Sequence, residues 1–181
     1  MLKYVNFDIV FQEIPDEVTM AVNISNCPNR CPGCHSSWLQ TDIGDPLTTD
    51  SLDALMKPYL NDITCVCFMG GDGEPGDVAL LAAHIKDLYP CEPDLDHAGL
   101  KVGWYSGNSN LPTGFDLTNF DFVKLGPYIE GLGGLKSPKT NQKLFRIHPI
   151  TAEIEDNADT DQLSPDRKFI MRRIAIPRSF L

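Results

Sequence analysis

The chain has little basic charge and no long apolar run. Lys and Arg number 15 against 25 Asp and Glu, which gives the 181 residues a net charge of −10. Because phosphate binding requires a concentrated basic face, this balance argues against nucleic acid as a partner. No apolar segment approaches the roughly 20 residues of a membrane span, so we expect no membrane partner. The first residues lack the basic-then-apolar pattern of a secretory signal, which predicts a cytoplasmic protein.

The rest of the composition is that of an ordinary globular protein, apart from its cysteines. Hydrophobic residues make up 42% of the chain and charged residues 22%. The length corresponds to about one domain with a sizeable core. Because cytoplasmic thiols stay reduced, the six cysteines need an explanation other than disulfides.

Short apolar runs alternate with helical patterns along residues 1–150. The periodicity predicts helices at 50–59 and 77–89 and strands at 18–24, 63–69, 100–105, 120–125 and 144–147. Alternating strands and helices predict an α/β fold with a mainly parallel sheet. We expect residues 1–150 to form this domain. Residues 151–181 follow as an acidic linker and a strand-like, apolar and basic tail at 168–176.

Three cysteines gather in one loop directly after the strand predicted at 18–24. Cys27, Cys31 and Cys34 are spaced by four and three residues, and two prolines between them prevent a regular helix. Three thiolates from such a loop can converge on one soft metal centre.

Four interpretations of this loop compete. A thioredoxin-like pair of Cys31 and Cys34 would leave Cys27 without a role. The Cys31–His35 segment also matches the attachment motif of c-type haem, which normally belongs outside the cytoplasm. Structural zinc needs a fourth ligand, and His35 directly beside Cys34 is awkwardly placed for one. The fourth interpretation is a [4Fe–4S] cluster held by three thiolates, which leaves one iron open to a ligand.

The loop and its context resemble the radical S-adenosylmethionine enzymes. The closer similarity is to the activating proteins of anaerobic (class III) ribonucleoside-triphosphate reductases, and it covers about residues 1–148. It rests on Cys31-Pro32-Gly33-Cys34, Gly70-Gly71-Asp72, Trp104-Tyr105-Ser106-Gly107 and Asn141-Gln142. The tryptophan run departs from the family pattern, because Trp104 and Tyr105 are adjacent with no residue between them.

The resemblance implies a partial, open (βα) barrel with its site at the carboxyl ends of the strands. It implies an oxidoreductase that cleaves S-adenosylmethionine reductively and generates a glycyl radical on the large catalytic subunit of the anaerobic reductase. A low-potential electron donor would be the other partner. Two alternatives remain, which are an activase of another glycyl radical enzyme and a non-catalytic metal- or thiol-binding module.

The resemblance also assigns site residues. The metal ligands would be Cys27, Cys31 and Cys34, and the residues around the S-adenosylmethionine would be Gly33, Cys34, His35, Gly70, Gly71 and Asp72. Either Asp72 or Glu74 would receive the amine of the bound S-adenosylmethionine, and the position of Asp72 directly after the two glycines favours Asp72.

The remaining cysteines and histidines have no ligand spacing. Cys65 and Cys67 lie two apart in an apolar strand, which predicts core packing and poor disulfide geometry. Cys91 is a lone thiol to which we assign no role. We also assign none to the three histidines outside the cysteine loop, which are His84, His97 and His148.

Overall fold

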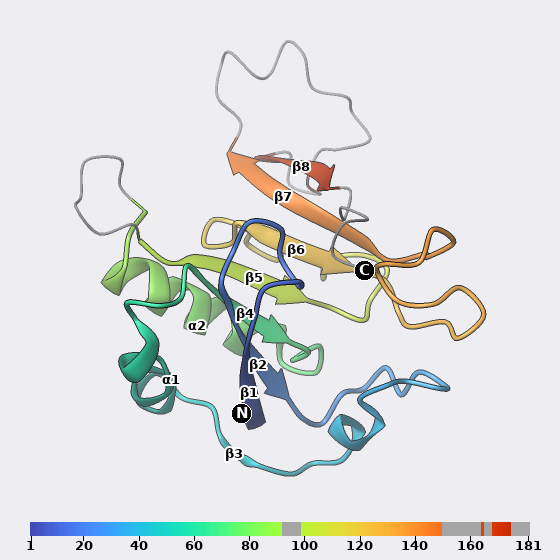
Figure 1. Ribbon diagram of the computed structural model, residues 1–181, viewed down its shortest axis with the longest axis horizontal. Coiled ribbons are helices and arrows are strands. Elements are labelled where there is room, and N and C mark those ends of the chain that lie inside the picture. Colours follow the sequence, from blue (N-terminus) through green and yellow to red (C-terminus); the bar gives the residue numbers. More distant parts are fainter. Residues whose placement is uncertain (92–98, 150–163, 165–167, 175–181) are drawn as a thin grey trace.

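The computed structural model describes residues 1–91, 99–149, 164 and 168–174, and its centre is one eight-stranded sheet (Figure 1). The spatial order of the strands is β3-β1-β2-β4-β5-β6-β7-β8. Their bounds are β1 Lys3–Val10, β2 Thr19–Ile24, β3 Asp45–Pro46, β4 Cys65–Met69, β5 Lys101–Tyr105, β6 Phe122–Leu125, β7 Lys143–Pro149 and β8 Phe169–Ile174. The helices are α1 Thr49–Met56 and α2 Pro75–Leu88, with 3-10 turns η1 Ser37–Gln40 and η2 Lys57–Tyr59.

The middle of the sheet is parallel. β2 pairs with β4, β4 with β5, and β5 with β6, all in the same direction. The connection from β2 to β4 contains α1, and the connection from β4 to β5 is α2. The N-cap of α1 is Thr48, directly before its first helical residue. The Thr48 side chain accepts a hydrogen bond from the Ser51 N–H in a capping box.

The expectation of a mainly parallel sheet is wrong, because four of the seven strand pairings are antiparallel. These are β1 with β2, β1 with β3, β6 with β7, and β7 with β8. The connections explain the difference. The segment 11–18 between β1 and β2 is too short for a parallel crossover, and the longer segment 126–142 between β6 and β7 contains no helix, which is the usual crossover element. The class α/β is confirmed, with a mixed sheet.

Both helices pack on one face of the sheet. Leu52 and Met56 of α1 and Val78 of α2 share one apolar core with Val66 and Phe68 of β4. The alternate residues of β4 point to the other face. There Cys65 and Cys67 pack with other buried side chains, namely Ile14, Tyr105, Phe122 and Leu144. The apolar pattern on both sides of β4 therefore reflects a strand that is buried on both faces.

The C-terminal part of the described chain adds one more strand to this sheet. The strand-like run expected at 168–176 contains β8, which pairs antiparallel with β7. The acidic stretch between residues 151 and 166 lies outside the described residues, apart from Ser164. In the part of the chain that the structure describes, no helix has the length and apolar character needed to cross a membrane.

Candidate functional site

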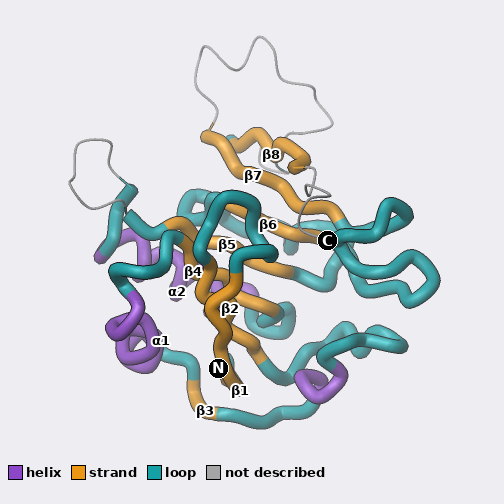
Figure 2. The backbone as a smooth tube through the Cα atoms, viewed as in Figure 1, coloured by secondary structure: helices purple, strands orange, loops and turns teal. Residues whose placement is uncertain are grey.

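Four loops meet at one edge of the sheet, because the parallel strands β2, β4, β5 and β6 all end there. The cysteine loop follows β2, the glycine turn follows β4, and the segments from Ser106 and Gly126 follow β5 and β6. These loops, teal in Figure 2, continue from the carboxyl ends of the strands. Ligand sites of α/β proteins with parallel strands collect at this edge.

Asp72 joins three of these loops through its carboxylate. The carboxylate accepts hydrogen bonds from Asn29 Nδ2 of the cysteine loop at 3.0 Å and from the Gly107 N–H at 3.0 Å. It also accepts from the Ser106 hydroxyl, which is fully buried, and from Asn108 Nδ2 at 3.2 Å. A carboxylate has about four acceptor positions, so these four donors occupy them.

The hydrogen bonds of Asp72 oppose the role that the resemblance assigned to it. A carboxylate that receives a ligand amine needs a free acceptor position, and Asp72 already accepts four hydrogen bonds from its own chain. Asp72 is therefore a positioning residue in this structure, which holds the cysteine loop against the end of β5.

The two glycines before Asp72 form the turn that the sequence predicts at the end of β4. Gly70 and Gly71 have φ values of 106° and 85°, in the left-handed region that favours glycine. A Cβ added to Gly71 would lie 2.6 Å from a methyl group of Val78 in α2. The Gly70 carbonyl accepts a hydrogen bond from the Trp104 indole N–H at 2.7 Å. The buried Trp104 thus fixes this turn from the neighbouring strand.

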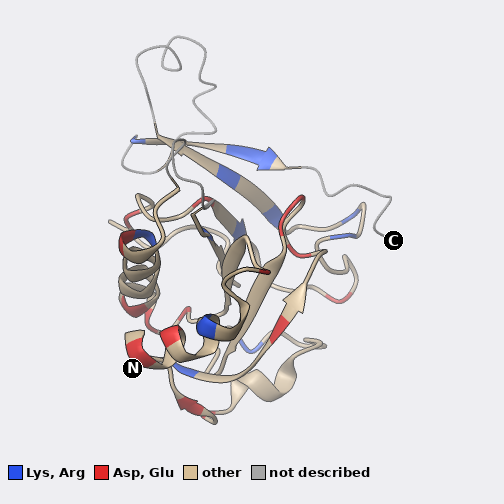
Figure 3. Ribbon diagram, turned by 60° about the vertical axis from the view of Figure 1, so that its left-hand side comes forward, with Lys and Arg blue, Asp and Glu red and all other residues tan. Residues whose placement is uncertain are grey.

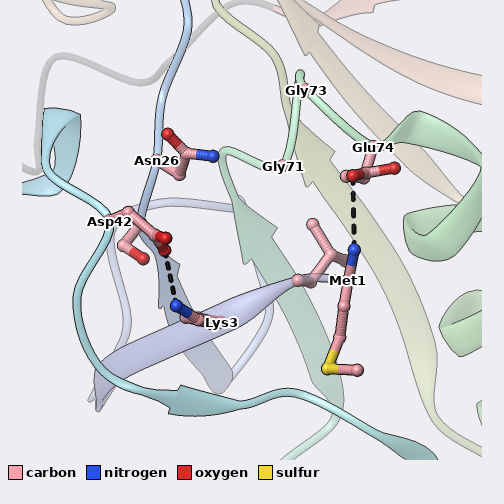
Figure 4. A pocket seen from close by; sticks show the side chains of 9 residues that line it. Met1, Lys3, Asn26, Asp42, Gly71, Gly73 and Glu74 are labelled. Atoms are coloured by element: carbon pink, nitrogen blue, oxygen red, sulfur yellow. Dashed lines mark hydrogen bonds and ion pairs between the residues drawn. The ribbon is translucent and has the colours of Figure 1, made fainter.

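Glu74, the other carboxylate considered for the amine, lies in a small pocket beside the start of β1 (Figure 4). Its Oε1 is 3.2 Å from the amino group of Met1, and Asp77 is 3.5 Å from the same group. Lys3 and Asp42 form a second ion pair of 2.8 Å in the pocket. The Glu74 side chain is 55% exposed beside this ion pair.

The cysteine loop is anchored at both ends by backbone hydrogen bonds. The Asn26 N–H donates to the Thr41 carbonyl at 3.2 Å, and the Cys27 N–H donates to Leu39 O at 3.0 Å. Within the loop the Cys34 N–H donates to the Cys31 carbonyl at 3.2 Å. The hydrogen bond between Cys34 and Cys31 closes a reverse turn. The loop therefore contains a turn at this point and no regular helix, as expected from its prolines.

The three loop thiols are free and half-buried, whereas Cys65 and Cys67 are buried in the core as expected. Burial raises the pKa of the Cys65 and Cys67 thiols well above the usual value, which makes them inert. Among the described residues, no three Cys, His, Asp or Glu side chains are gathered as a metal ion would require. The loop has the thiolate donors that an iron–sulfur cluster prefers, and it lies at the appropriate edge of the sheet, but its thiols do not surround one point.

The segment after β6 contacts the cysteine loop near Gly33 and His35. His35 and Tyr128 have ring centroids 4.8 Å apart, and the Tyr128 hydroxyl is 3.1 Å from Nε2 of His35. A Cβ added to Gly33 would lie 3.1 Å from the Glu130 carboxyl carbon. Gly33 and His35, both expected around the S-adenosylmethionine, are therefore contacted by the loop that contains Tyr128 and Glu130, although both stay exposed.

A buried lysine lies beneath these loops. Lys124 of β6 is 8% exposed, and its Nζ donates to the carbonyls of Ser106 at 3.2 Å and Gly126 at 3.0 Å. Burial lowers its pKa, and the nearby Asp72 and Cys31 act in the opposite direction. The ammonium group thus holds the ends of β5 and β6 together close to the cysteine loop.

One buried acceptor at this edge has no partner. Asn141 donates from Nδ2 to the Pro127 carbonyl at 2.9 Å, but its Oδ1 is buried without a hydrogen bond among the described residues. Gln142, the second residue of the pair that the resemblance uses, donates to the Gly126 carbonyl at 3.4 Å. A buried acceptor of this kind is normally satisfied by an ordered water or a ligand.

Sequence reasoning missed three residues of this site. A charged residue inside the apolar run Phe122–Leu125 was a signal for Lys124. Ser106 belongs to the tryptophan run that the resemblance uses, but its hydrogen bond to Asp72 could not be foreseen. Asn29 gives no sequence signal, because its partner lies 43 residues further along the chain.

Comparison with family models, with curated proteins and with solved structures found no match.

Proposed function

We propose that this chain is a radical S-adenosylmethionine enzyme whose sheet corresponds to a partial, open barrel. Within that class we propose an activase that generates a glycyl radical on the large subunit of an anaerobic ribonucleoside-triphosphate reductase. The observation that supports the proposal is the position of the Cys27–Cys34 loop, which follows a parallel strand and is tied through Asn29 to the Gly70-Gly71-Asp72 turn.

In this proposal Cys27, Cys31 and Cys34 would hold a [4Fe–4S] cluster once the loop has drawn their thiols together. When bound, such a cluster would supply the electron for reductive cleavage of S-adenosylmethionine, which is the chemistry proposed to generate the glycyl radical on the partner. The electron would come from a low-potential electron donor. The chain itself orients the ligands and excludes water.

Two residues would support the cysteine loop in this role. Asp72 fixes the loop through Asn29, and Lys124 places a cation close to Cys31. A cation near the thiolates offsets part of the negative charge that three thiolates bring to the site. The unpartnered Asn141 Oδ1 is the acceptor that we propose for a donor group of S-adenosylmethionine, since the Asp72 carboxylate already accepts four hydrogen bonds.

Anaerobic reconstitution with iron and sulfide tests the ligand assignment. We expect Cys27→Ala, Cys31→Ala and Cys34→Ala each to lose stable cluster binding, because no neighbouring thiol replaces the lost ligand. Cys91→Ala is the matched control, since its thiol is exposed and contacts Lys86 at 3.5 Å. Iron and sulfide content and the visible spectrum are the measurements. Full cluster retention in any of the first three variants would refute the assignment.

The reaction itself is tested with the reconstituted wild-type chain and a chemical reductant. Release of methionine and 5′-deoxyadenosine supports the enzyme, and tight binding of zinc in place of iron favours the metal-binding module. A glycyl radical seen by electron paramagnetic resonance on the anaerobic reductase, but not on a formate-lyase type of enzyme, separates the two kinds of activase.

A further inference from the structure

The strands β7 and β8 form a basic surface on an acidic protein. Their residues include Arg146, His148, Arg172 and Arg173 and no Asp or Glu, although acidic residues exceed basic ones by ten in the chain. Figure 3 shows the blue segments on the two strands at the top of the view, with no red between them. Positive charge is therefore concentrated on these two strands, although the protein as a whole is negatively charged.

Two of these arginines lie side by side on the sheet face opposite the helices α1 and α2. Arg146 and Arg172 are direct partners in the antiparallel register, so their side chains point to the same side. The guanidinium of Arg146 lies 5.3 Å from the ring centroid of the buried Phe122, which also belongs to that face. This contact holds the arginine over the sheet and leaves the polar edge of its guanidinium for other partners.

Like charges in direct register destabilise a strand pair unless something offsets them. None of the ion pairs among the described residues contains an arginine. Both Arg146 and Arg172 are exposed. The pair is thus a repulsive arrangement that the described part of the chain does not neutralise.

His148 extends this pair along the same face. It lies two residues after Arg146 on β7, and its partner in the register is Ile170 of β8. Burial lowers the pKa of His148, and Arg172 and Arg146 lower it further. The imidazole thus experiences the field of both guanidinium groups, which places the three side chains in one electrostatic cluster.

We propose that Arg146, Arg172 and His148 form a binding site for the phosphate chain of a polyphosphate-bearing ligand. A phosphate group offers several acceptor oxygens that two adjacent guanidinium groups can bind at once in forked geometry. Along a strand, residues two apart are separated by about 6.6 Å, so the third group reaches a neighbouring phosphate of the same chain. This site is independent of the function proposed above, because it uses none of the residues at the carboxyl edge.

Titration calorimetry of the full chain with inorganic tripolyphosphate, at fixed ionic strength, tests the site. We expect saturable binding that weakens at least tenfold in Arg146→Gln and in Arg172→Gln. Arg146→Lys keeps the positive charge but lacks the planar guanidinium that binds two phosphate oxygens at once. We therefore expect its loss of affinity to lie between those of the wild type and Arg146→Gln. Arg173→Gln is the matched control, because Arg173 lies on the same strand but its side chain points to the opposite face, beside Phe145. Its affinity is expected to stay within twofold of wild type.

A second readout is the imidazole of His148, one of four histidines in the chain. Bound phosphate offsets the two arginines, so we expect the pKa of His148 in a proton NMR titration to rise when tripolyphosphate is added. Repeating the calorimetry with ATP distinguishes the sources of the phosphate chain. Tighter binding of ATP supports a nucleotide, and equal binding supports a free polyphosphate.

Two results would overturn the site. One is the lack of saturable tripolyphosphate binding to the wild-type chain. The other is an equal loss of affinity in Arg173→Gln and Arg172→Gln, which would show general attraction to a basic surface.

Discussion

Replacement of Asp72 by alanine should destabilise the fold itself. The substitution leaves four donors without their acceptor, including the hydroxyl of the fully buried Ser106 and the Gly107 N–H. A hydrogen bond to a charged group contributes roughly 1.5–3 kcal/mol, but water can replace part of the loss because Asn29 and Asn108 are only half-buried. We therefore expect a loss of roughly 2–4 kcal/mol rather than the sum of four bonds.

Urea denaturation of the wild type and three variants measures this loss. Asp72→Asn keeps one oxygen acceptor, so its free energy of unfolding should fall between those of the wild type and Asp72→Ala. Asp8→Ala is the control, since Asp8 is an exposed carboxylate on β1 and surface changes of this kind usually stay within about 0.5 kcal/mol. A loss in Asp72→Ala no larger than that of Asp8→Ala would refute the argument that this carboxylate holds the loops together.

Two further predictions concern the glycine turn and the basic strands. Gly71→Ala should destabilise the protein by about 2–4 kcal/mol, because it combines a positive φ with a Cβ 2.6 Å from a valine methyl group of α2. Gly76→Ala, in α2 with no atom within 4 Å of the new Cβ, should instead stabilise it by about 0.5–1 kcal/mol in the same urea assay. The pKa of His148 is lowered in the folded state, so the unfolded state binds more protons and stability is lost as the pH falls below about 6.5. In His148→Asn the free energy of unfolding should vary less with pH between about 5 and 7, and an unchanged profile would contradict the shift.

The central strands of the fold were predictable because the pattern of apolar side chains along a strand shows which of its faces are buried. Cys65–Met69 is apolar on both faces, and a strand covered by helices on one side and by packed side chains on the other needs this composition. β1 was missed although it carried a signal. Val5, Phe7 and Ile9 alternate with Asn6 and Asp8, which is the pattern of a strand buried on one face only.

The direction of the outer strands could not be predicted in the same way. Periodicity reports which face of a strand is buried, but not whether the next strand runs parallel or antiparallel to it. That choice depends on the connection, and the segments before β2 and β7 are loops without helices.

The cysteine loop and the Gly70-Gly71 turn could be located from the sequence, but the function of Asp72 could not. Its partners lie in two loops far apart along the chain, and only the folded sheet brings Asn29 and Ser106 to the same carboxylate. A motif therefore indicated where this acidic residue lies without indicating which groups it binds.

The same carboxylate has a consequence for the order in which the protein folds. Its hydrogen bonds span 34 to 43 residues along the chain, so they form only after β4 and β5 have paired and closed the loops between them. Substitutions at Asp72 should therefore leave the refolding rate nearly unchanged and accelerate unfolding. The kinetic φ-value, which is the change in the folding barrier divided by the change in stability, should be near zero. The cysteine loop would then acquire its native shape only after the pair of strands β4 and β5 that supports it.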